Sequence, residues 1–254
     1  MSLANGDFQD SPTAIEGLAW GRHQCHAYPH THCRLPTHWR QASDGACLSQ
    51  ETLRTLPPVP IARTLVNYHV ENLAWYHNVI HGPTFLAQCE RLWSYGTVED
   101  PQWLAVYCAV LSSAAWTIAN ATDGVPWLPD AAHTATNMME RAKACLYDED
   151  FMSRHTVHSI QAICILNMVA HVLGRSDLLA TLVSAAIRVA QCLGLHRIPH
   201  GVSPGLPSEQ WTEALDREVG RRVWWKLVEL DYHSMPYTGT LGELSPRRLV
   251  VVSH

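Results

Sequence analysis

The chain has 254 residues, and 18 Lys and Arg residues against 23 Asp and Glu residues give a formal net charge of −5 with His neutral. Hydrophobic residues make up 47% and charged residues only 16%, so the apolar content suffices for a core and excludes a chain that is disordered overall. A deficit of Lys and Arg also excludes a strongly basic nucleic-acid binder.

The start of the chain differs in composition from the rest. Residues 1–13 are small and polar, and we expect them to be disordered, with no secretory signal among them. Residues 14–60 form an irregular arm rich in Pro, His and Cys. From residue 61 to residue 254 the apolar pattern becomes helical. The sequence therefore predicts a helical domain that follows an irregular N-terminal arm.

Apolar spacing and helix-end signals predict about seven helices. Two of the segments, 101–120 and 156–173, are apolar on nearly all sides, which is typical of buried helices. The second of these and the next helix form an antiparallel hairpin, and a short β-prone tail, 249–252, closes the chain. The fold class is all-α, a single helical domain. The predicted helices are 61–78, 85–95 with Thr84 as N-cap, 101–120, 130–146, 156–173, 176–193 and 209–233.

Cysteine usage and apolar run lengths set the expected environment. The chain has eight Cys and no Cys-x-x-Cys pair, and five of the eight lie in apolar helical stretches. Free Cys behaves there as a small hydrophobic residue, which favours a reducing compartment. The longest apolar runs are interrupted well before the roughly 20 residues of a membrane span. We therefore expect no membrane segment.

Three local motifs in order carry a resemblance to a known family. They are Trp75–Phe85, with the residues WYHNVIHGPTF, Ala185–Arg197, with AAIRVAQCLGLHR, and Glu218–Asp231, with EVGRRVWWKLVELD, followed by Gly239. Together they resemble the fungal-specific transcription factor domain, the middle homology region of fungal binuclear zinc-cluster activators. Residues 16–22 also resemble the segment that precedes this domain in one branch of the family, so the resemblance covers about residues 14–250.

The resemblance implies a nuclear transcription regulator, with a metabolic or secondary-metabolite pathway as its expected target. In the family the middle domain restrains or modulates the activator, sometimes in response to a small molecule. The first three cysteines, Cys25, Cys33 and Cys47, are widely spaced and lack dense basic flanks, so the sequence shows no zinc cluster. We therefore expect no direct DNA binding and no cofactor. The expected partner is a full-length transcription factor or a second copy. The chain could also be a fragment of a longer regulator.

An enzyme is the alternative hypothesis. A helical domain freed from DNA binding could be a cofactor-free cyclase or isomerase for an apolar natural product, and it would then be cytoplasmic. The sequence contains no G-x-S-x-G, Walker A, G-x-G-x-x-G or H-E-x-x-H motif, and no catalytic residue is assigned. Under either hypothesis a pocket for a small apolar ligand is expected between helices. Its candidate residues are Trp75, Tyr76, His77, His81, Trp224, Tyr232 and His233.

Metal binding is the less favoured interpretation of the His and Cys residues. In the arm, Cys25, His30, His32 and Cys33 are weak candidates, because their spacing fits no standard zinc finger. An irregular linker is the favoured alternative. His77 and His81 lie four residues apart, but no Glu follows the first. A structural role is therefore expected, with the ring N–H of one or both donating to a carbonyl at the turn.

The helix 209–233 combines a basic stripe with interleaved carboxylates, which favours a packing element over a phosphate site. Glu218 can pair with Arg221 and Arg222 at i+3 and i+4. Arg222 and Asp231 are expected to be structural polar residues, with an Arg–Asp hydrogen bond that holds neighbouring helices together. Of the adjacent Trp residues, 224 and 225, one should face the core and the other the surface or a cleft.

Overall fold

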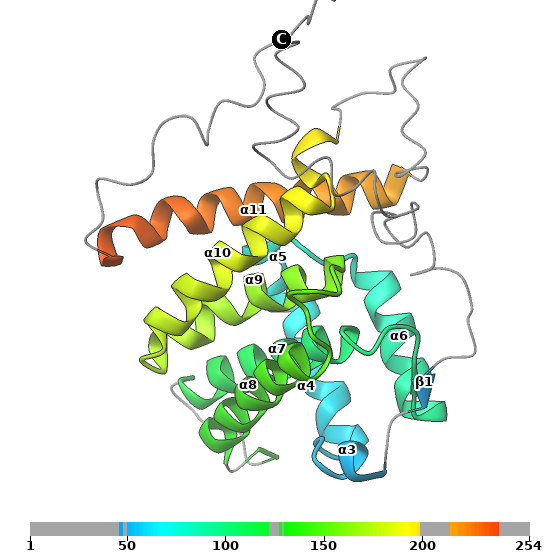
Figure 1. The fold of residues 1–254 in the computed structure, drawn as a ribbon. Helices are drawn as coiled ribbons and strands as arrows, with labels where there is room; N and C mark the ends of the chain where they lie inside the picture. The colour runs from blue at the N-terminus through cyan, green and yellow to red at the C-terminus, as the bar shows by residue number, and fades with distance from the viewer. Residues whose placement is uncertain (1–45, 48–49, 122–126, 129, 199–213, 239–254) are drawn as a thin grey trace, which may run out of the picture. The chain divides into compact units, whose positions relative to one another are not determined.

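The computed structural model describes residues 46–47, 50–121, 127–128, 130–198 and 214–238, all within the unit formed by residues 36–254. The predicted features at 1–45 and 249–252 lie outside these residues. In chain order the elements are β1 (Ala46–Cys47), α3 (Gln50–Arg54), α4 (Val59–Asn72), α5 (Ala74–His77), α6 (Gly82–Tyr95), β2 (Thr97–Val98), α7 (Trp103–Ala119), α8 (Ala131–Asp148), α9 (Val157–Val172), α10 (Ser176–Cys192), η2 (Leu195–Arg197) and α11 (Ala214–Thr238) (Figure 1).

The all-α prediction is confirmed. Within the described ranges, seven helices have 14 residues or more, namely α4 and α6 to α11. The described strands are two residues long each, and they pair antiparallel with Ala46 opposite Val98. The two short strands have no counterpart in the sequence prediction, because two residues are too few to show an alternating pattern. The helix α3 has no counterpart either.

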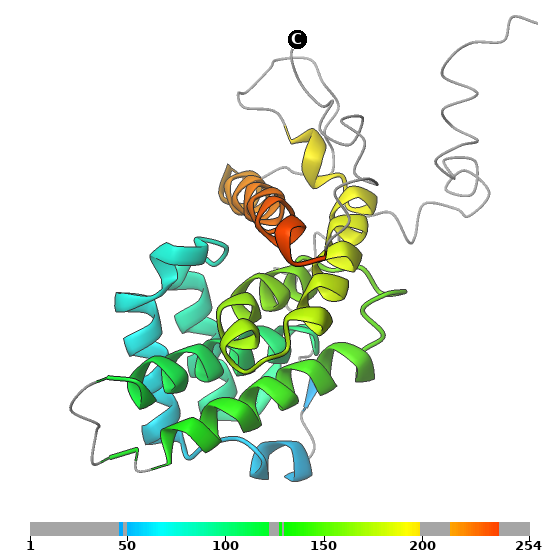
Figure 2. The ribbon, with the colours of Figure 1, turned by 90° about the vertical axis from the view of Figure 1, so that its left-hand side faces the viewer.

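The core is built around α7. This helix buries nearly every side chain and packs against α4, α8 and α9. The next most buried helix, α9, forms a hairpin with α10, as the sequence predicts, and Gly174 ends it with a positive φ of 69°. Figure 2 shows that α11 lies over the hairpin on the side away from α8. Burial all round these two helices confirms them as the central layer.

Several helix ends differ from the prediction. The predicted helix 61–78 is interrupted after Asn72, so that α5 is a separate turn. Pro83 lies in the first turn of α6, where a missing N–H costs nothing, and the N-cap is His81 rather than Thr84. Toward the other end of the chain, α11 continues two residues past Pro236. Proline there removes only one hydrogen bond near the end of a long helix.

Free cysteines occupy the core as expected, with one exception. Cys89, Cys108, Cys145 and Cys164 are buried, whereas Cys192, in the last position of α10, is exposed. Burial raises the pKa of the Cys164 thiol to about 12. The Cys164 thiol therefore remains protonated and behaves as an apolar packing group. None of the described helices combines the length and the apolar character that a membrane crossing requires.

Candidate functional site

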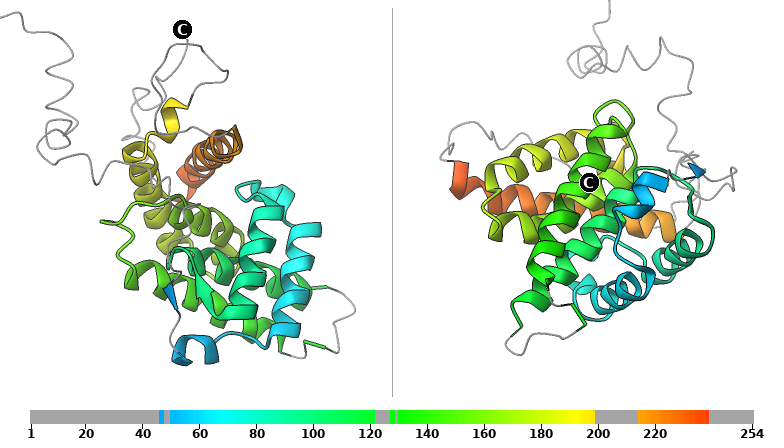
Figure 3. Two further views of the ribbon diagram at one scale, coloured as in Figure 1. Left: turned by 90° about the vertical axis from the view of Figure 1, so that its right-hand side faces the viewer. Right: turned by 90° about the horizontal axis from the view of Figure 1, so that it is seen from below.

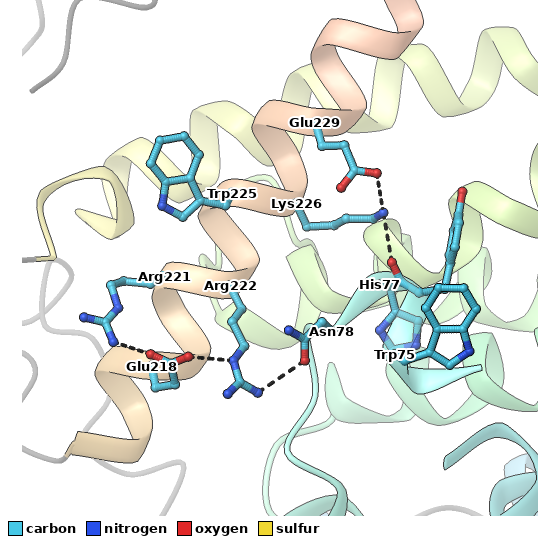
Figure 4. Close-up of a pocket in the computed structure, with 10 residues that line it drawn as sticks. Trp75, His77, Asn78, Glu218, Arg221, Arg222, Trp225, Lys226 and Glu229 are labelled. Carbon is cyan, nitrogen blue, oxygen red and sulfur yellow. Dashed lines mark hydrogen bonds and ion pairs between the residues drawn. The ribbon is translucent and has the colours of Figure 1, made fainter. Parts of the chain in front are cut away.

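A cleft of about 610 Å³ lies between α5 and α11. Figure 3 shows α5 at the end of the α4 and α6 pair that lies nearest α11. The close-up shows Lys226 and Arg222 of α11 extending toward the α5 side, while Trp225 and Arg221 project from the other side of α11 (Figure 4). The lining residues are Trp75, Tyr76, His77 and Asn78 from the α5 side, and Glu218, Arg221, Arg222, Trp225, Lys226 and Glu229 from α11.

The α5 side of the cleft is a tight turn with a left-handed end. Asn78 adopts φ 52° and ψ 27°, and its N–H donates to the Ala74 carbonyl at 2.8 Å. Asn is one of the few non-glycine residues that adopts this conformation readily. The indole N–H of Trp75 donates to the Asn72 carbonyl at 2.8 Å, while 77% of the residue remains exposed. The turn thus presents a fixed indole ring to solvent.

The α11 side is a broad helix face. The lining residues recur at intervals of three or four, which makes them neighbours on the helix surface. Glu218 accepts hydrogen bonds from Arg221 and from Nε of Arg222, the latter at 2.8 Å. These two guanidinium groups lower the pKa of the Glu218 carboxyl. The predicted pairs at i+3 and i+4 are therefore present, and they leave the carboxylate ionised.

Lys226 joins the two sides of the cleft. Its side chain is only 4% exposed, and its Nζ donates to the Tyr76 carbonyl at 3.2 Å and to Oε1 of Glu229 at 2.7 Å. The same ammonium lies 4.4 Å from the centroid of the Tyr76 ring, within the range of a cation–π interaction. A second link runs from Nη1 of Arg222 to Oδ1 of Asn78 at 3.3 Å. Both links hold α5 against α11.

Behind the cleft, a buried chain of hydrogen bonds runs from α5 into the core. The Val79 N–H donates to Nδ1 of His77 at 3.3 Å, which places the ring proton of His77 on Nε2. That proton is donated to Nε2 of His69 at 2.8 Å, so His69 in turn donates from Nδ1 to Ser113 at 2.8 Å. Ser113 donates to the Val110 carbonyl at 2.9 Å. The chain is complete with both rings neutral.

Burial explains why both rings are neutral. It lowers the pKa of His69 to about 3, because a charged imidazole would lose its hydration in the core. Burial also lowers the pKa of His77, and the neighbouring His69 ring and Lys226 ammonium lower it further. The proposed carbonyl partner at the turn is thus wrong for His77, whose ring N–H goes to another imidazole. The two buried rings instead satisfy each other's hydrogen-bonding nitrogens.

The structure brings only some of the predicted pocket residues together. Trp75, Tyr76 and His77 line the cleft. His81 lies apart, at the start of α6, where Nδ1 is 2.8 Å from the Thr84 hydroxyl rather than from a carbonyl. Tyr232 and His233 are exposed beyond the last lining residue of α11 and contact each other, with ring centroids 5.8 Å apart. Only part of the predicted set of pocket residues therefore lines the cleft.

Two expectations about α11 need correction. Trp224 lies against His196, with ring centroids 5.6 Å apart, and Trp225 lines the cleft in its place. The reason is the helical rotation of about 100° between neighbours, which puts Trp225 in line with Arg221 and Arg222. Asp231 lies nine residues beyond Arg222, roughly 13 Å along the helix axis. Arg222 pairs with Glu218 and Asn78 instead.

The weak metal candidates of the arm, Cys25, His30, His32 and Cys33, lie outside the described residues. Within the residues that are described, no three His, Cys, Asp or Glu side chains gather in a way that could hold a metal ion. His77 and His81 each have a protein partner for one ring nitrogen or both.

Sequence reasoning missed His69, Trp225 and the linking role of Lys226. Trp225 and Lys226 follow Glu218 at helical spacing and lie on the same broad face of the helix. This spacing is the signal that could have found them. No local signal distinguishes His69, because its partners lie 8 and 44 residues away in the chain.

Comparison with known proteins identifies relatives of this helical body. The model of the family described as "Fungal specific transcription factor domain" matches residues 66–235, which run from the middle of α4 into α11. No solved structure matches the chain significantly.

Curated relatives share most of this chain but are much longer. "Probable transcription factor lepB" of Aspergillus flavus is 28% identical over 200 residues, which cover 75% of this chain and 35% of that protein. "Transcription factor xilB" of Penicillium rubens is 28% identical over 197 residues, covering 71% and 28%. "Agnestins biosynthesis cluster transcription factor AgnL11" of Paecilomyces divaricatus is 22% identical over 213 residues, covering 80% and 31%. The chain thus spans about a third of the length of these relatives.

Proposed function

Because the chain belongs to the family of fungal specific transcription factor domains, we propose that it regulates transcription in the nucleus. The observation that carries the proposal is the family match over residues 66–235, which includes both sides of the α5–α11 cleft. The relatives named above are all called transcription factors, and one is named for a biosynthesis cluster. The expected targets are therefore genes of a metabolic or secondary-metabolite pathway.

We further propose that the chain acts through a protein partner, either a full-length member of the family or a second copy. The net charge of −5 disfavours direct contact with phosphate. Trp75, Trp225 and Tyr232 expose large aromatic surfaces on α5 and α11. Aromatic residues of this kind are enriched at the cores of protein interfaces. Co-purification of differently tagged copies, with and without a co-expressed relative, tests which partner is bound.

Deletion of the gene, followed by paired RNA and metabolite profiling, tests the regulatory function. We expect coordinated loss of the transcripts of a pathway, together with loss of its product. Unchanged transcripts with accumulation of a single pathway intermediate would overturn the proposal in favour of an enzyme. Complementation with the wild-type chain is the control for both outcomes.

A further inference from the structure

The α5–α11 cleft has the chemistry of a small-molecule site. We propose that it binds a small aromatic anion, whose ring lies against Trp225 and whose acidic group accepts hydrogen bonds from Arg222. Binding itself is independent of the regulatory function. The role of the anion as an effector rests on that function, and the two are tested separately below.

The size of the cleft fits such a ligand. Its volume of about 610 Å³ lies within the roughly 300–1,000 Å³ that is usual for small-molecule sites. By contrast, a second cavity beside His81 and Thr84 has a volume of about 20 Å³, which is space for a single water molecule. Among these two cavities only the cleft can admit an organic molecule.

An exposed indole ring provides the apolar surface. Trp225 is 56% exposed, and Figure 4 shows it on the side of α11 away from Trp75. Trp225 comes three residues after Arg222, so the two side chains are neighbours on the surface of α11. A large exposed aromatic ring gains free energy when a planar ligand covers it. This ring favours an aromatic ligand.

Charge in the cleft favours an anion. The lining contains three cations, Arg221, Arg222 and Lys226, against two carboxylates, Glu218 and Glu229. The cleft therefore has a formal excess of one positive charge, although the whole chain has a net charge of −5. The sequence alone predicts an apolar ligand. The structure adds the cations and thereby specifies an acidic group on it.

Arg222 is the residue that can receive the acidic group. Lys226 is nearly buried and already contacts Tyr76 and Glu229. In the described part of the chain, Glu218 and Asn78 engage two of the five N–H groups of the Arg222 guanidinium. Figure 4 shows this group in the space between α11 and Asn78. Its remaining N–H groups can form the paired hydrogen bonds that guanidinium makes with a carboxylate.

The cleft is also connected to the core, which provides a physical route for an effector. His77 lines the cleft and donates to His69 on α4, which contacts Ser113 on α7. A ligand that moves α5 relative to α11 would disturb this buried chain. An effector can shift a conformational equilibrium only if it binds one state more tightly. The hydrogen-bonded chain is the element whose two arrangements a ligand in the cleft could favour differently.

A matched pair of probes tests the charge requirement. The anion 8-anilinonaphthalene-1-sulfonate and the neutral N-phenyl-1-naphthylamine have the same ring system, and both fluoresce on binding apolar surface. We expect the purified chain to bind the anion about tenfold more tightly than the neutral probe, since charge-assisted hydrogen bonds are the stronger ones. We also expect 2-naphthoate, but not 2-naphthamide, to displace the bound anion.

Substitutions locate the site. Arg222→Gln should abolish the preference for the anion, whereas Arg188→Gln, at an exposed Arg of α10 that contacts Gln191, should preserve it. Trp225→Ser should weaken both probes, while Tyr95→Ser, at a 76% exposed ring on α6, should weaken neither. Thermal unfolding of each variant shows whether it folds, and the Trp225 and Arg222 variants test the site independently.

Equal affinities for the two probes, or an unchanged preference in the Arg222→Gln protein, would overturn the proposal. If gene deletion alters transcripts but the anion is not preferred, this inference fails and the regulatory function stands. If the anion is preferred but deletion leaves transcripts unchanged, the site stands and the regulatory function fails. The two results thus separate the site from its proposed role.

Discussion

The α7–α9 layer and the α5–α11 cleft differ in the kind of side chain that builds them. The two central helices bury apolar side chains on nearly every face, and their contacts are not specific to any ligand. The cleft instead exposes indole rings and is held together by Lys226 and Arg222 through polar links. The difference teaches that apolar burial and exposed aromatic or polar side chains are placed in different parts of the fold.

The largest expected effect is in the central layer. Leu111 in α7 is fully buried, so Leu111→Ala should lower the free energy of unfolding by about 3 kcal/mol, from lost apolar burial and the cavity left behind. Urea denaturation measures this. Val172→Ala, at a position exposed on α9, is the control and should change the value by under about 0.5 kcal/mol. Similar losses for both variants would contradict the assignment of α7 as core.

Acid should weaken the protein through His69. Its pKa of about 3 lies below the ordinary 6.5, so the unfolded chain binds the proton more readily than the folded one. The stabilisation is therefore fully present above pH 6.5 and is lost as the pH falls toward 3. At pH 5 the loss from this group is about 2 kcal/mol relative to pH 8.

Denaturant midpoints at pH 8 and pH 5 measure this effect. His133→Gln, at an exposed position of α8, should leave the pH dependence unchanged, whereas His69→Gln should reduce it. Should the wild-type midpoint stay constant between these pH values, the buried neutral pair would be refuted even if the His69 variant failed to fold.

A smaller effect is expected at the link between the two regions. Lys226→Met keeps the length of the side chain but removes the bond to the Tyr76 carbonyl and the cation–π contact, and it should cost about 1.5 kcal/mol. Lys143→Met removes a partly exposed i+3 pair with Glu140 and should cost under about 0.5 kcal/mol. Equal costs would mean that Lys226 does not join α5 to α11.

The smallest effect on stability is expected in the cleft itself. Trp225→Ser removes an exposed ring and should change the free energy of unfolding by under about 0.5 kcal/mol. Hydrogen exchange of the α7 and α9 amides should likewise be unchanged. A large loss of stability or of protection would show that recognition and folding share this residue, and the comparison between the regions would fail.

Much of the fold was predictable because long helices show a sustained apolar period, which indicates that they exist even where their ends are misplaced. The buried helices α7 and α9 show this, since their apolar character on all sides predicts their central position. The break after Asn72 was not predictable, because the residues on either side continue the apolar period. The break lies between His69 and His77, whose rings contact each other only in the folded chain.

The cleft was predictable only in part. Trp75, Tyr76 and His77 follow from a resemblance that marks the turn. Which face of α11 meets that turn depends on the rotation of the helix in the packed structure, and the sequence pattern does not fix it. This is why Trp224 was expected at the cleft and Trp225 was found there.

The most direct test of the account complements a deletion strain with variant chains and measures the pathway transcripts. The account predicts that Tyr95→Ser restores the transcripts to the wild-type level, while Trp225→Ser, though equally stable and equally abundant, does not. Restoration by both variants would contradict the claim that the α5–α11 cleft is where a folded helical domain exerts its regulatory function.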